Sequence, residues 1–237
     1  MKLESRSWGT GDRTALLVHG LFSDSGSWYR IGPALAERGY RVIVPDLRGH
    51  GRSGRGRYSV VDWSMDVLET VEEPPELAIG HSLGGLVLGV IAEALRPRAA
   101  VYLDPAWRMD AAQDAAFREE WSSWLEWTSP EQLRTHLGSR WPERDVRLRW
   151  ESMQAADPAV VPGLARGGGY DYSPERATMP SLVLAADPSG FITPEHALTL
   201  AERGLTVRRV PGSGHSYFRE DADGFLRELD EWRTGGR

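Results

Sequence analysis

The sequence predicts an α/β fold in which a mostly parallel central sheet is flanked by helices. Short apolar runs alternate with longer amphipathic segments, as in strands joined by crossover helices. A glycine-flanked pentapeptide, residues 80–84, stands between one apolar run and a helical pattern. A polar segment at residues 107–176 interrupts the alternation and predicts a helical insertion. With 237 residues, 41% of them hydrophobic, the chain can bury one full core.

The first half of the chain supplies most of the expected sheet. Strands are predicted at residues 15–18, 40–44, 77–79 and 99–103. The segments between them, residues 31–38, 60–71 and 86–91, have helical patterns. Two further strands, 181–186 and 206–210, follow the insertion, and a helix at 221–232 can pack its apolar side chains on the sheet.

The insertion is predicted to be helical. Helical patterns occur at residues 117–125, 130–137 and 146–153, and Gly167 to Gly169 form a run that could act as a hinge. We therefore expect residues 1–106 and 177–237 to form a core and residues 107–176 a helical cap. Six of the ten tryptophans fall in the insertion: Trp107, Trp121, Trp124, Trp127, Trp141 and Trp150. Trp107 and Trp124 are candidate substrate contacts, although helical spacing by itself favours packing within the cap for any one of these tryptophans.

The pentapeptide Gly80-His81-Ser82-Leu83-Gly84 predicts a nucleophile. Between a strand and a helix, G-x-S-x-G forms a sharp turn that exposes the serine at its tip. Glycine on both sides allows the close approach of the chains. Ser82 is therefore the candidate nucleophile.

A serine nucleophile needs a base and a site for the oxyanion. His215 follows the last predicted strand within residues 212–216 and is the candidate base. One oxyanion donor is the backbone N–H after the nucleophile, on Leu83, and the other comes from the turn after an earlier strand. Leu21 is our choice for the second donor, and its neighbour Phe22 is a further candidate substrate contact.

These motifs, taken in order, resemble those of the α/β-hydrolase superfamily over nearly the whole chain. The resemblance is to serine-nucleophile, small-cap members of the esterase or lactonase type. It is carried by His19-Gly20, the PDLRGHGRS segment at residues 45–53, GHSLGG at residues 80–85, and Gly214-His215. The resemblance implies that Asp46 and Arg48 have a structural role beneath the pocket.

The triad acid is where the sequence departs from this family. The family's usual acid position corresponds to Ser189, which cannot serve as an acid. Asp187, two residues earlier, could replace it if the following loop bends inward. Asp104 follows strand 99–103, a position that some family members use. Both aspartates remain candidates.

Composition and sequence patterns limit which catalytic groups, cofactors and partners are expected. The net charge of −6 and the dispersed arginines argue against a nucleic-acid partner. The absence of cysteine excludes thiolate catalysis, and no metal-ligand or phosphate-loop pattern is present, so we expect neither a metal nor another cofactor. The chain begins without an apolar signal region and has no long apolar run, which predicts a cytoplasmic protein with no membrane partner. The sequence predicts no oligomeric state.

The predicted function is acyl-bond hydrolysis. The resemblance and Ser82 together predict a serine hydrolase that cleaves an ester, lactone or related acyl bond of a mainly apolar or aromatic small molecule. Carbon–carbon bond hydrolysis, another non-ester reaction, and a slow-turnover ligand receptor remain alternatives, because a fold alone does not fix a reaction.

Overall fold

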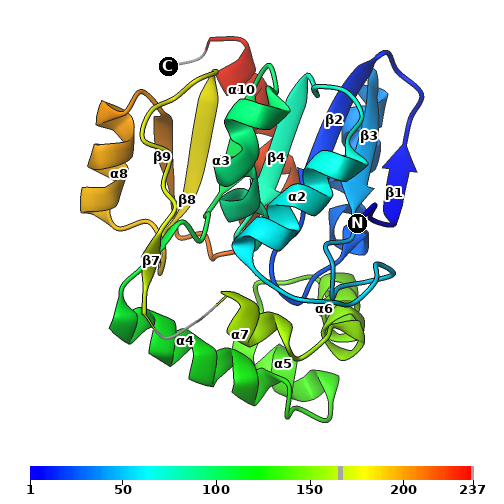
Figure 1. Cartoon of the computed structure of the whole chain (residues 1–237), viewed down its shortest axis with the longest axis vertical. Helices are drawn as coiled ribbons and strands as arrows, with labels where there is room; N and C mark the ends of the chain where they lie inside the picture. The colour runs from blue at the N-terminus through cyan, green and yellow to red at the C-terminus, as the bar shows by residue number, and fades with distance from the viewer. Residues whose placement is uncertain (165–167, 236–237) are drawn as a thin grey trace.

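The computed structural model describes residues 1–164 and 168–235 and contains a seven-stranded sheet (Figure 1). The strand order is β1-β3-β2-β4-β5-β8-β9, and every neighbouring pair is parallel except β1 and β3. The strands are β1 (Ser5–Trp8), β2 (Arg13–Val18), β3 (Tyr40–Pro45), β4 (Leu77–His81), β5 (Ala100–Leu103), β8 (Ser181–Asp187) and β9 (Thr206–Pro211). The predicted mostly parallel sheet is confirmed.

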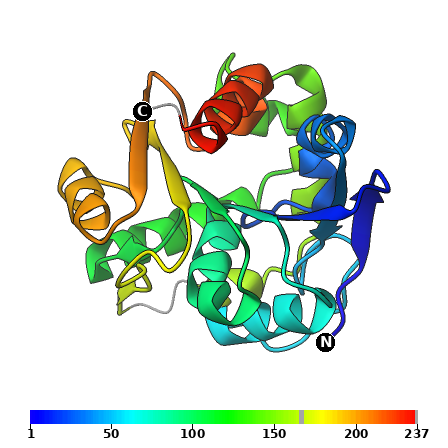
Figure 2. The same cartoon turned by 90° about the horizontal axis from the view of Figure 1, so that it is seen from above.

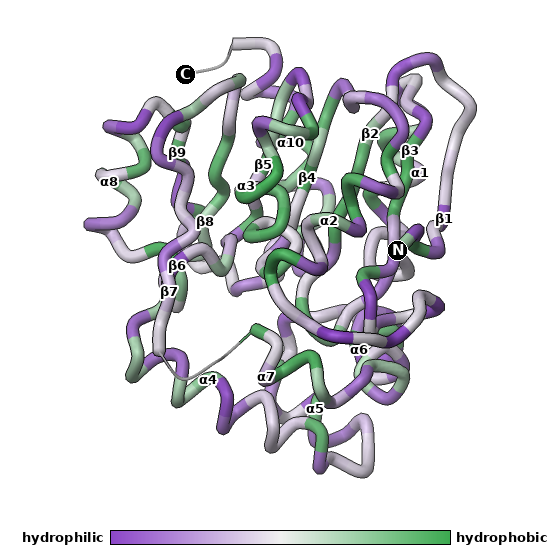
Figure 3. The backbone as a smooth tube through the Cα atoms, in the orientation of Figure 1, coloured by the Kyte–Doolittle hydropathy of each residue, from purple (hydrophilic) through white to green (hydrophobic). Residues whose placement is uncertain are grey.

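Helices cover both faces of this sheet (Figure 2). The helices α1 (Ile31–Glu37) and α10 (Ala222–Arg233) contribute to one buried apolar cluster, with alternate residues of the strands. The helices α2 (Val60–Thr70), α3 (Leu83–Leu95) and α8 (Pro194–Glu202) contribute to the other cluster. Successive strand residues point to opposite faces, so β2 places Leu17 in the first cluster and Leu16 in the second. The central strands are accordingly hydrophobic along most of their length (Figure 3).

Among the described residues between β5 and β8, four helices gather at the carboxyl ends of the strands (Figure 1). They are α4 (Ala111–Trp124), α5 (Pro130–Leu137), α6 (Glu143–Ala155) and α7 (Val160–Leu164). A two-stranded pair, β6 (Arg108–Met109) and β7 (Tyr170–Asp171), joins the two ends of this segment. Gly167, part of the predicted hinge, lies outside the described residues.

The starts of these helices follow from local sequence. Asp110 accepts a hydrogen bond from the Gln113 N–H, and the Gln113 side chain accepts one from the Asp110 N–H, so α4 begins with a capping box. The helix α5 begins with Ser129 and Pro130, where the missing N–H of proline costs nothing. Each of these two helices therefore starts where its sequence satisfies the exposed backbone donors.

One buried carboxylate ties α6 to the rest of the fold. Asp145 is fully buried and accepts hydrogen bonds from the Tyr29 hydroxyl at 3.0 Å and from Arg30 Nη2 at 2.9 Å. Arg219 Nη1, on the short helix α9 (Tyr217–Glu220), lies 3.4 Å from the same carboxylate. The position of α6 over the sheet is thus fixed by a buried network of ion pairs and hydrogen bonds.

Candidate active site

Ser82 stands at a strained turn between β4 and α3. Its φ of 52° and ψ of −116° lie in a region that side chains other than glycine rarely adopt. A Cβ on Gly80 would lie 2.5 Å from the Gly84 carbonyl oxygen, and a Cβ on Gly84 would overlap the carbonyl of Val18. Only glycine fits at both flanking positions, so the sequence forces the sharp turn that presents Ser82 to the cavity beside it.

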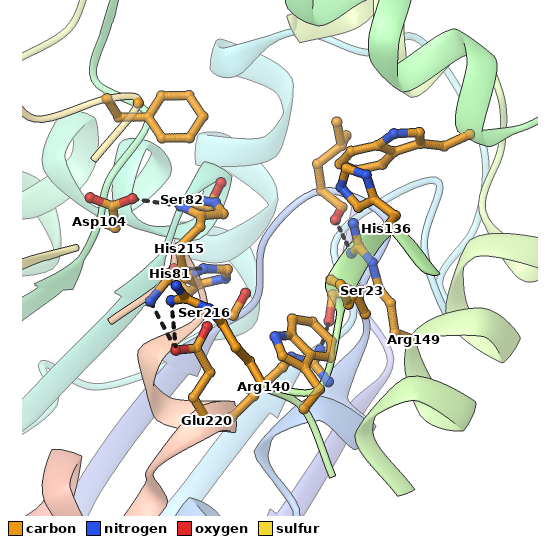
Figure 4. Close-up of a pocket in the computed structure, with 18 of the residues that line it drawn as sticks. Ser23, His81, Ser82, Asp104, His136, Arg140, Arg149, His215, Ser216 and Glu220 are labelled. Atoms are coloured by element: carbon orange, nitrogen blue, oxygen red, sulfur yellow. Dashed lines mark hydrogen bonds and ion pairs between the residues drawn. The ribbon is translucent and has the colours of Figure 1, made fainter. Parts of the chain in front are cut away.

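His215 and Asp104 form a close pair in the same cavity (Figure 4). The distance from His215 Nδ1 to Asp104 Oδ2 is 2.7 Å. Because a carboxylate accepts, Nδ1 carries the hydrogen, and the other ring nitrogen, Nε2, is left to act as a base. Asp104 is 2% exposed, so its carboxylate is largely shielded from water, whereas the His215 side chain is 39% exposed.

The second carboxylate oxygen of Asp104 is held from β8 and the loop after it. Oδ1 accepts from the Ser189 hydroxyl at 2.6 Å and from the Ala186 N–H at 3.2 Å. Ser189 Oγ in turn accepts from the N–H groups of Phe191 and Ile192. Ser189 therefore orients Asp104, which directly follows the neighbouring strand β5.

Asp187 lies elsewhere. Its Oδ1 accepts from Arg209 Nη2 at 2.8 Å, and its side chain is 38% exposed. It does not line the cavity that contains Ser82. The candidate role of Asp187 as the partner of His215 is not supported by this geometry, because β9 supplies the carboxylate with a different cationic partner.

Two backbone N–H groups near Ser82 in the chain or in space have no hydrogen-bond acceptor among the described residues. Leu83 opens α3, where the first helical N–H groups have no partner within the helix. Leu21 lies in a turn whose Gly20 would place a Cβ 3.1 Å from the Cβ of Ser82. Within the described ranges, neither the Leu21 nor the Leu83 N–H has a hydrogen-bond acceptor. These two donors match the residues expected to bind an oxyanion.

A neutral histidine holds the turn that contains Leu21. His19 donates from Nδ1 to the Gly20 carbonyl and accepts from the Leu47 N–H at Nε2. Burial lowers the pKa of His19. The ring therefore stays neutral, so that one nitrogen can donate a hydrogen bond while the other accepts one. Asp46 supports the same region by accepting from the N–H groups of Ser25 and Arg52. These contacts agree with the structural role expected for the segment at residues 45–53.

His81 acts on the backbone of the candidate base. Its Nε2 donates to the His215 carbonyl at 2.9 Å, and the two rings lie 4.7 Å apart. Burial is the main cause that lowers the pKa of His81 well below its ordinary value, and the charge of His215 acts in the same direction. A neutral His81 therefore fixes the loop that carries His215.

The cavity has a volume of about 490 Å³, within the range of small-molecule sites. The insertion supplies one wall, which includes Phe117, Trp121 and Trp124, and Phe191 packs 4.9 Å from the His215 ring. Leu21 and Trp124 line the cavity as expected. Phe22 lies behind this lining, fully buried, with its ring 6.4 Å from that of Trp124.

Trp107 does not reach the cavity. Its side chain is fully buried, and its Nε1 donates to the Gly85 carbonyl at 3.0 Å. The ring also packs edge-on against Tyr102, with 4.7 Å between centroids. The interpretation of Trp107 as a substrate contact is therefore wrong in this structure, since its position at the start of the insertion places it in the core beside α3.

Sequence reasoning missed several polar residues at the site. Arg149 on α6 and His136 on α5 are among those that line the cavity, and Ser189 supports Asp104 from outside the lining. The signal in the sequence was weak. Asp145, Arg149 and Ser152 share one face of α6 by helical spacing, but polar residues on a helix usually face solvent.

No group of three or more His, Asp or Glu side chains in residues 1–164 and 168–235 could hold a metal ion. Of the helices that the structure describes, none has the length and hydrophobicity needed to cross a membrane.

Comparison with known proteins places the chain in a family. A sequence profile of the alpha/beta hydrolase family matches residues 15–228. The fold is similar to that of E-2-(acetamidomethylene)succinate hydrolase, with a TM-score of 0.80, 22% identity, and coverage of 98% of this chain and 95% of that chain. An esterase from Exiguobacterium antarcticum gives a TM-score of 0.79 at 16% identity, over 98% of this chain and 96% of that chain.

A pyrethroid hydrolase from Sphingobium wenxiniae is 36% identical over 84 residues, which cover 33% of this chain and 30% of that protein. Among the curated relatives compared, the matched region spans between 22% and 55% of the relative's length. The match to the family itself extends from β2 into α10 and includes the turn with Ser82 and the loop with His215. The chain is thus a member of the alpha/beta hydrolase family.

Proposed function

We propose that this protein is a serine hydrolase that cleaves a carboxylic ester, lactone or related acyl bond through an acyl-enzyme on Ser82. The observation that carries the proposal is the 2.7 Å contact between His215 and the buried Asp104, in the cavity that Ser82 lines. A histidine fixed in this tautomer can accept the serine proton and be stabilised when it becomes charged. In this proposal Asp104 is the acid of the triad.

The proposed reaction has two halves. Ser82 Oγ attacks the carbonyl carbon and its proton passes to His215, while the Leu21 and Leu83 N–H groups bind the oxyanion. The tetrahedral intermediate then collapses, His215 protonates the leaving alcohol, and an acyl-enzyme remains. Water, activated by His215, releases the acid and restores Ser82.

The segment at residues 107–176 is proposed to act as a cap over this reaction. Helices α4, α5 and α6 supply much of the cavity wall, so they can exclude water and select the substrate. The aromatic side chains of this wall favour a small molecule with an apolar or aromatic part. The esterase and the pyrethroid hydrolase among the related proteins are consistent with ester chemistry.

The test is hydrolysis of p-nitrophenyl esters, from acetate to palmitate, by the wild type and by Ser82→Ala. We expect the wild type to hydrolyse at least one ester and Ser82→Ala to lose about 10³-fold or more in kcat. Ser123→Ala, on an exposed position of α4, is the matched control and should retain wild-type activity. Hydrolysis that survives in Ser82→Ala would overturn the proposal, and the preferred chain length would measure the depth of the cavity.

A further inference from the structure

The cavity beside Ser82 is lined by three acidic residues, Asp104, Glu120 and Glu220, and by cationic ones. Three arginines line it: Arg140, Arg149 and Arg219. Arg219 is neutralised by Asp145 and also donates to the Ser23 hydroxyl at 2.8 Å. Arg140 donates to the Gly212 carbonyl and lies 3.9 Å from Glu220. Two of the three cations therefore have partners in the protein.

Arg149 is different. Its Nη1 donates to the Leu21 carbonyl, and no Asp or Glu within the described part of the chain lies at ion-pair distance from it. The charge of Asp24 favours the charged form of Arg149 and so opposes the effect of burial on its pKa. The Asp24 oxygens, however, already accept hydrogen bonds from the Gly26 N–H and the Ser152 hydroxyl. Arg149 thus presents an uncompensated guanidinium to the cavity.

The surroundings of Arg149 make this charge unfavourable without a ligand. Burial lowers the pKa of Arg149 to about 9, and repulsion from Arg219 acts in the same direction. The group still carries its charge at neutral pH. An anion placed against the guanidinium would recover the interaction that burial has removed, and it would do so in a site where charges interact more strongly than in water.

The guanidinium is also close to the reaction centre. It contacts the carbonyl of Leu21, the residue whose N–H is a proposed oxyanion donor. Its Cζ lies 5.8 Å from the Phe22 ring and 5.9 Å from the Trp124 ring. In Figure 4, Arg149 approaches the cavity from the side opposite Asp104 and His215. A group bound there would lie beside the turn that carries the proposed Leu21 donor.

We propose that Arg149 binds a carboxylate of the substrate, so that the natural substrates are esters or related acyl compounds that carry a free carboxylate a few bonds from the scissile carbonyl. This proposal rests on the proposed function of Ser82. A carboxylate matches the planar donor fork of arginine, which has N–H groups left after the bond to Leu21. Glu120 lines the cavity from α4 and would repel a carboxylate there, which favours the Arg149 side.

The test compares charged and neutral esters of similar size. In the first series the carboxylate is on the acyl side of the ester. We compare monomethyl succinate, glutarate and adipate with the neutral methyl pentanoate and methyl hexanoate, and follow hydrolysis in a pH-stat. For the alcohol side, 4-acetoxybenzoate is compared with its methyl ester. We expect kcat/KM of the wild type to be at least about 10-fold higher for the charged member of one series, as for a hydrogen-bonded charge pair.

Arg149→Met removes the charge and keeps most of the side-chain length. It should lower the ratio of kcat/KM for the preferred charged ester to kcat/KM for its neutral counterpart by about 10- to 100-fold. Activity on the neutral ester also reports that the variant is folded. Arg147→Met, on an exposed position of the same helix, is the control and should keep the preference.

The outcomes separate the two proposals. Two results with the wild type alone would overturn the proposed carboxylate-bearing substrate class. One is equal or better hydrolysis of the neutral esters, and the other is no hydrolysis of any charged ester. A preference that survives in Arg149→Met overturns the role of Arg149. Hydrolysis that survives in Ser82→Ala overturns the proposed function instead.

Discussion

At the scale of single residues, the proposed reaction depends on the contact between Asp104 and His215. Asp104 follows β5, and Asp187 ends the adjacent strand β8, so both aspartates lie at the carboxyl edge of the sheet. Only Asp104 contacts His215, whereas Asp187 pairs with Arg209. The two aspartates therefore make opposite predictions for mutagenesis.

Asp104→Asn should lower kcat for ester hydrolysis by about 10³- to 10⁴-fold, because the amide no longer stabilises the charged histidine or its tautomer. Asp187→Asn should change kcat by less than about 3-fold, since it loses only a partly exposed ion pair. Steady-state kinetics on the best p-nitrophenyl ester measure both. A severe loss in Asp187→Asn with an active Asp104→Asn would reverse the assignment.

The sequence predicted Ser82, His215 and the two backbone donors, because each depends on a local motif at the end of a strand. It left the acid open, because which aspartate meets His215 depends on the loop at residues 188–190 and on contacts between strands. The bond from Ser189 to Asp104 joins residues 85 positions apart in the chain. Local sequence carries no information about such a contact.

Ser189 is predicted to position Asp104. Ser189→Ala should lower kcat by about 10-fold and leave KM nearly unchanged, because the carboxylate loses one of its two hydrogen bonds outside the histidine pair. Ser189→Thr keeps the hydroxyl and should recover most of kcat. An equal loss in both variants would indicate a packing effect rather than a hydrogen bond.

At the scale of elements, the regular core was easier to predict than the segment over the site. Apolar runs predicted six strands of the sheet, but β1 was missed because its four residues, SRSW, are mostly polar and lie at the sheet edge. The helix α6 was expected from its apolar residues. The contacts of Asp145 and Arg149 on this helix were not expected, because their partners lie on distant elements.

Asp145 is predicted to fix α6 on the core. Asp145→Asn leaves Arg219 buried without a carboxylate, and loss of one partner from a buried ion pair typically lowers the free energy of unfolding by about 3 kcal/mol. Urea denaturation measures this change. The control is Glu143→Gln, also on α6, which removes an exposed ion pair with Arg134. It should change the free energy of unfolding by less than about 0.5 kcal/mol.

At the scale of the whole molecule, buried neutral histidines couple folding to pH. His19, His50 and His81 are all buried, and burial lowers their pKa values, for His50 to about 3. In the unfolded chain these groups regain the ordinary histidine pKa of 6.5 and take up protons below that pH. The unfolded state then binds more protons than the folded state, so stability falls as the pH falls from 6.5.

We therefore expect the free energy of unfolding to fall between pH 6 and pH 5, by about 1 kcal/mol for His50, with contributions of the same sign from His19 and His81. Denaturation midpoints between pH 8 and pH 5 test this expectation. His50→Gln, which can keep the hydrogen bond to the Arg48 carbonyl, should reduce the slope. Constant stability over this range would show that the histidines do not remain neutral in the folded protein.

The central claim is that Ser82 is the nucleophile of an acyl-transfer site, and covalent labelling tests it most directly. The wild type and Ser82→Ala are treated with an alkyl p-nitrophenyl phosphonate, and the intact masses and the peptide containing residue 82 are measured. The account predicts a single phosphonyl adduct on Ser82 in the wild type and none in Ser82→Ala. An adduct that persists in Ser82→Ala, or an ester-hydrolysing wild type that forms none at Ser82, would contradict it.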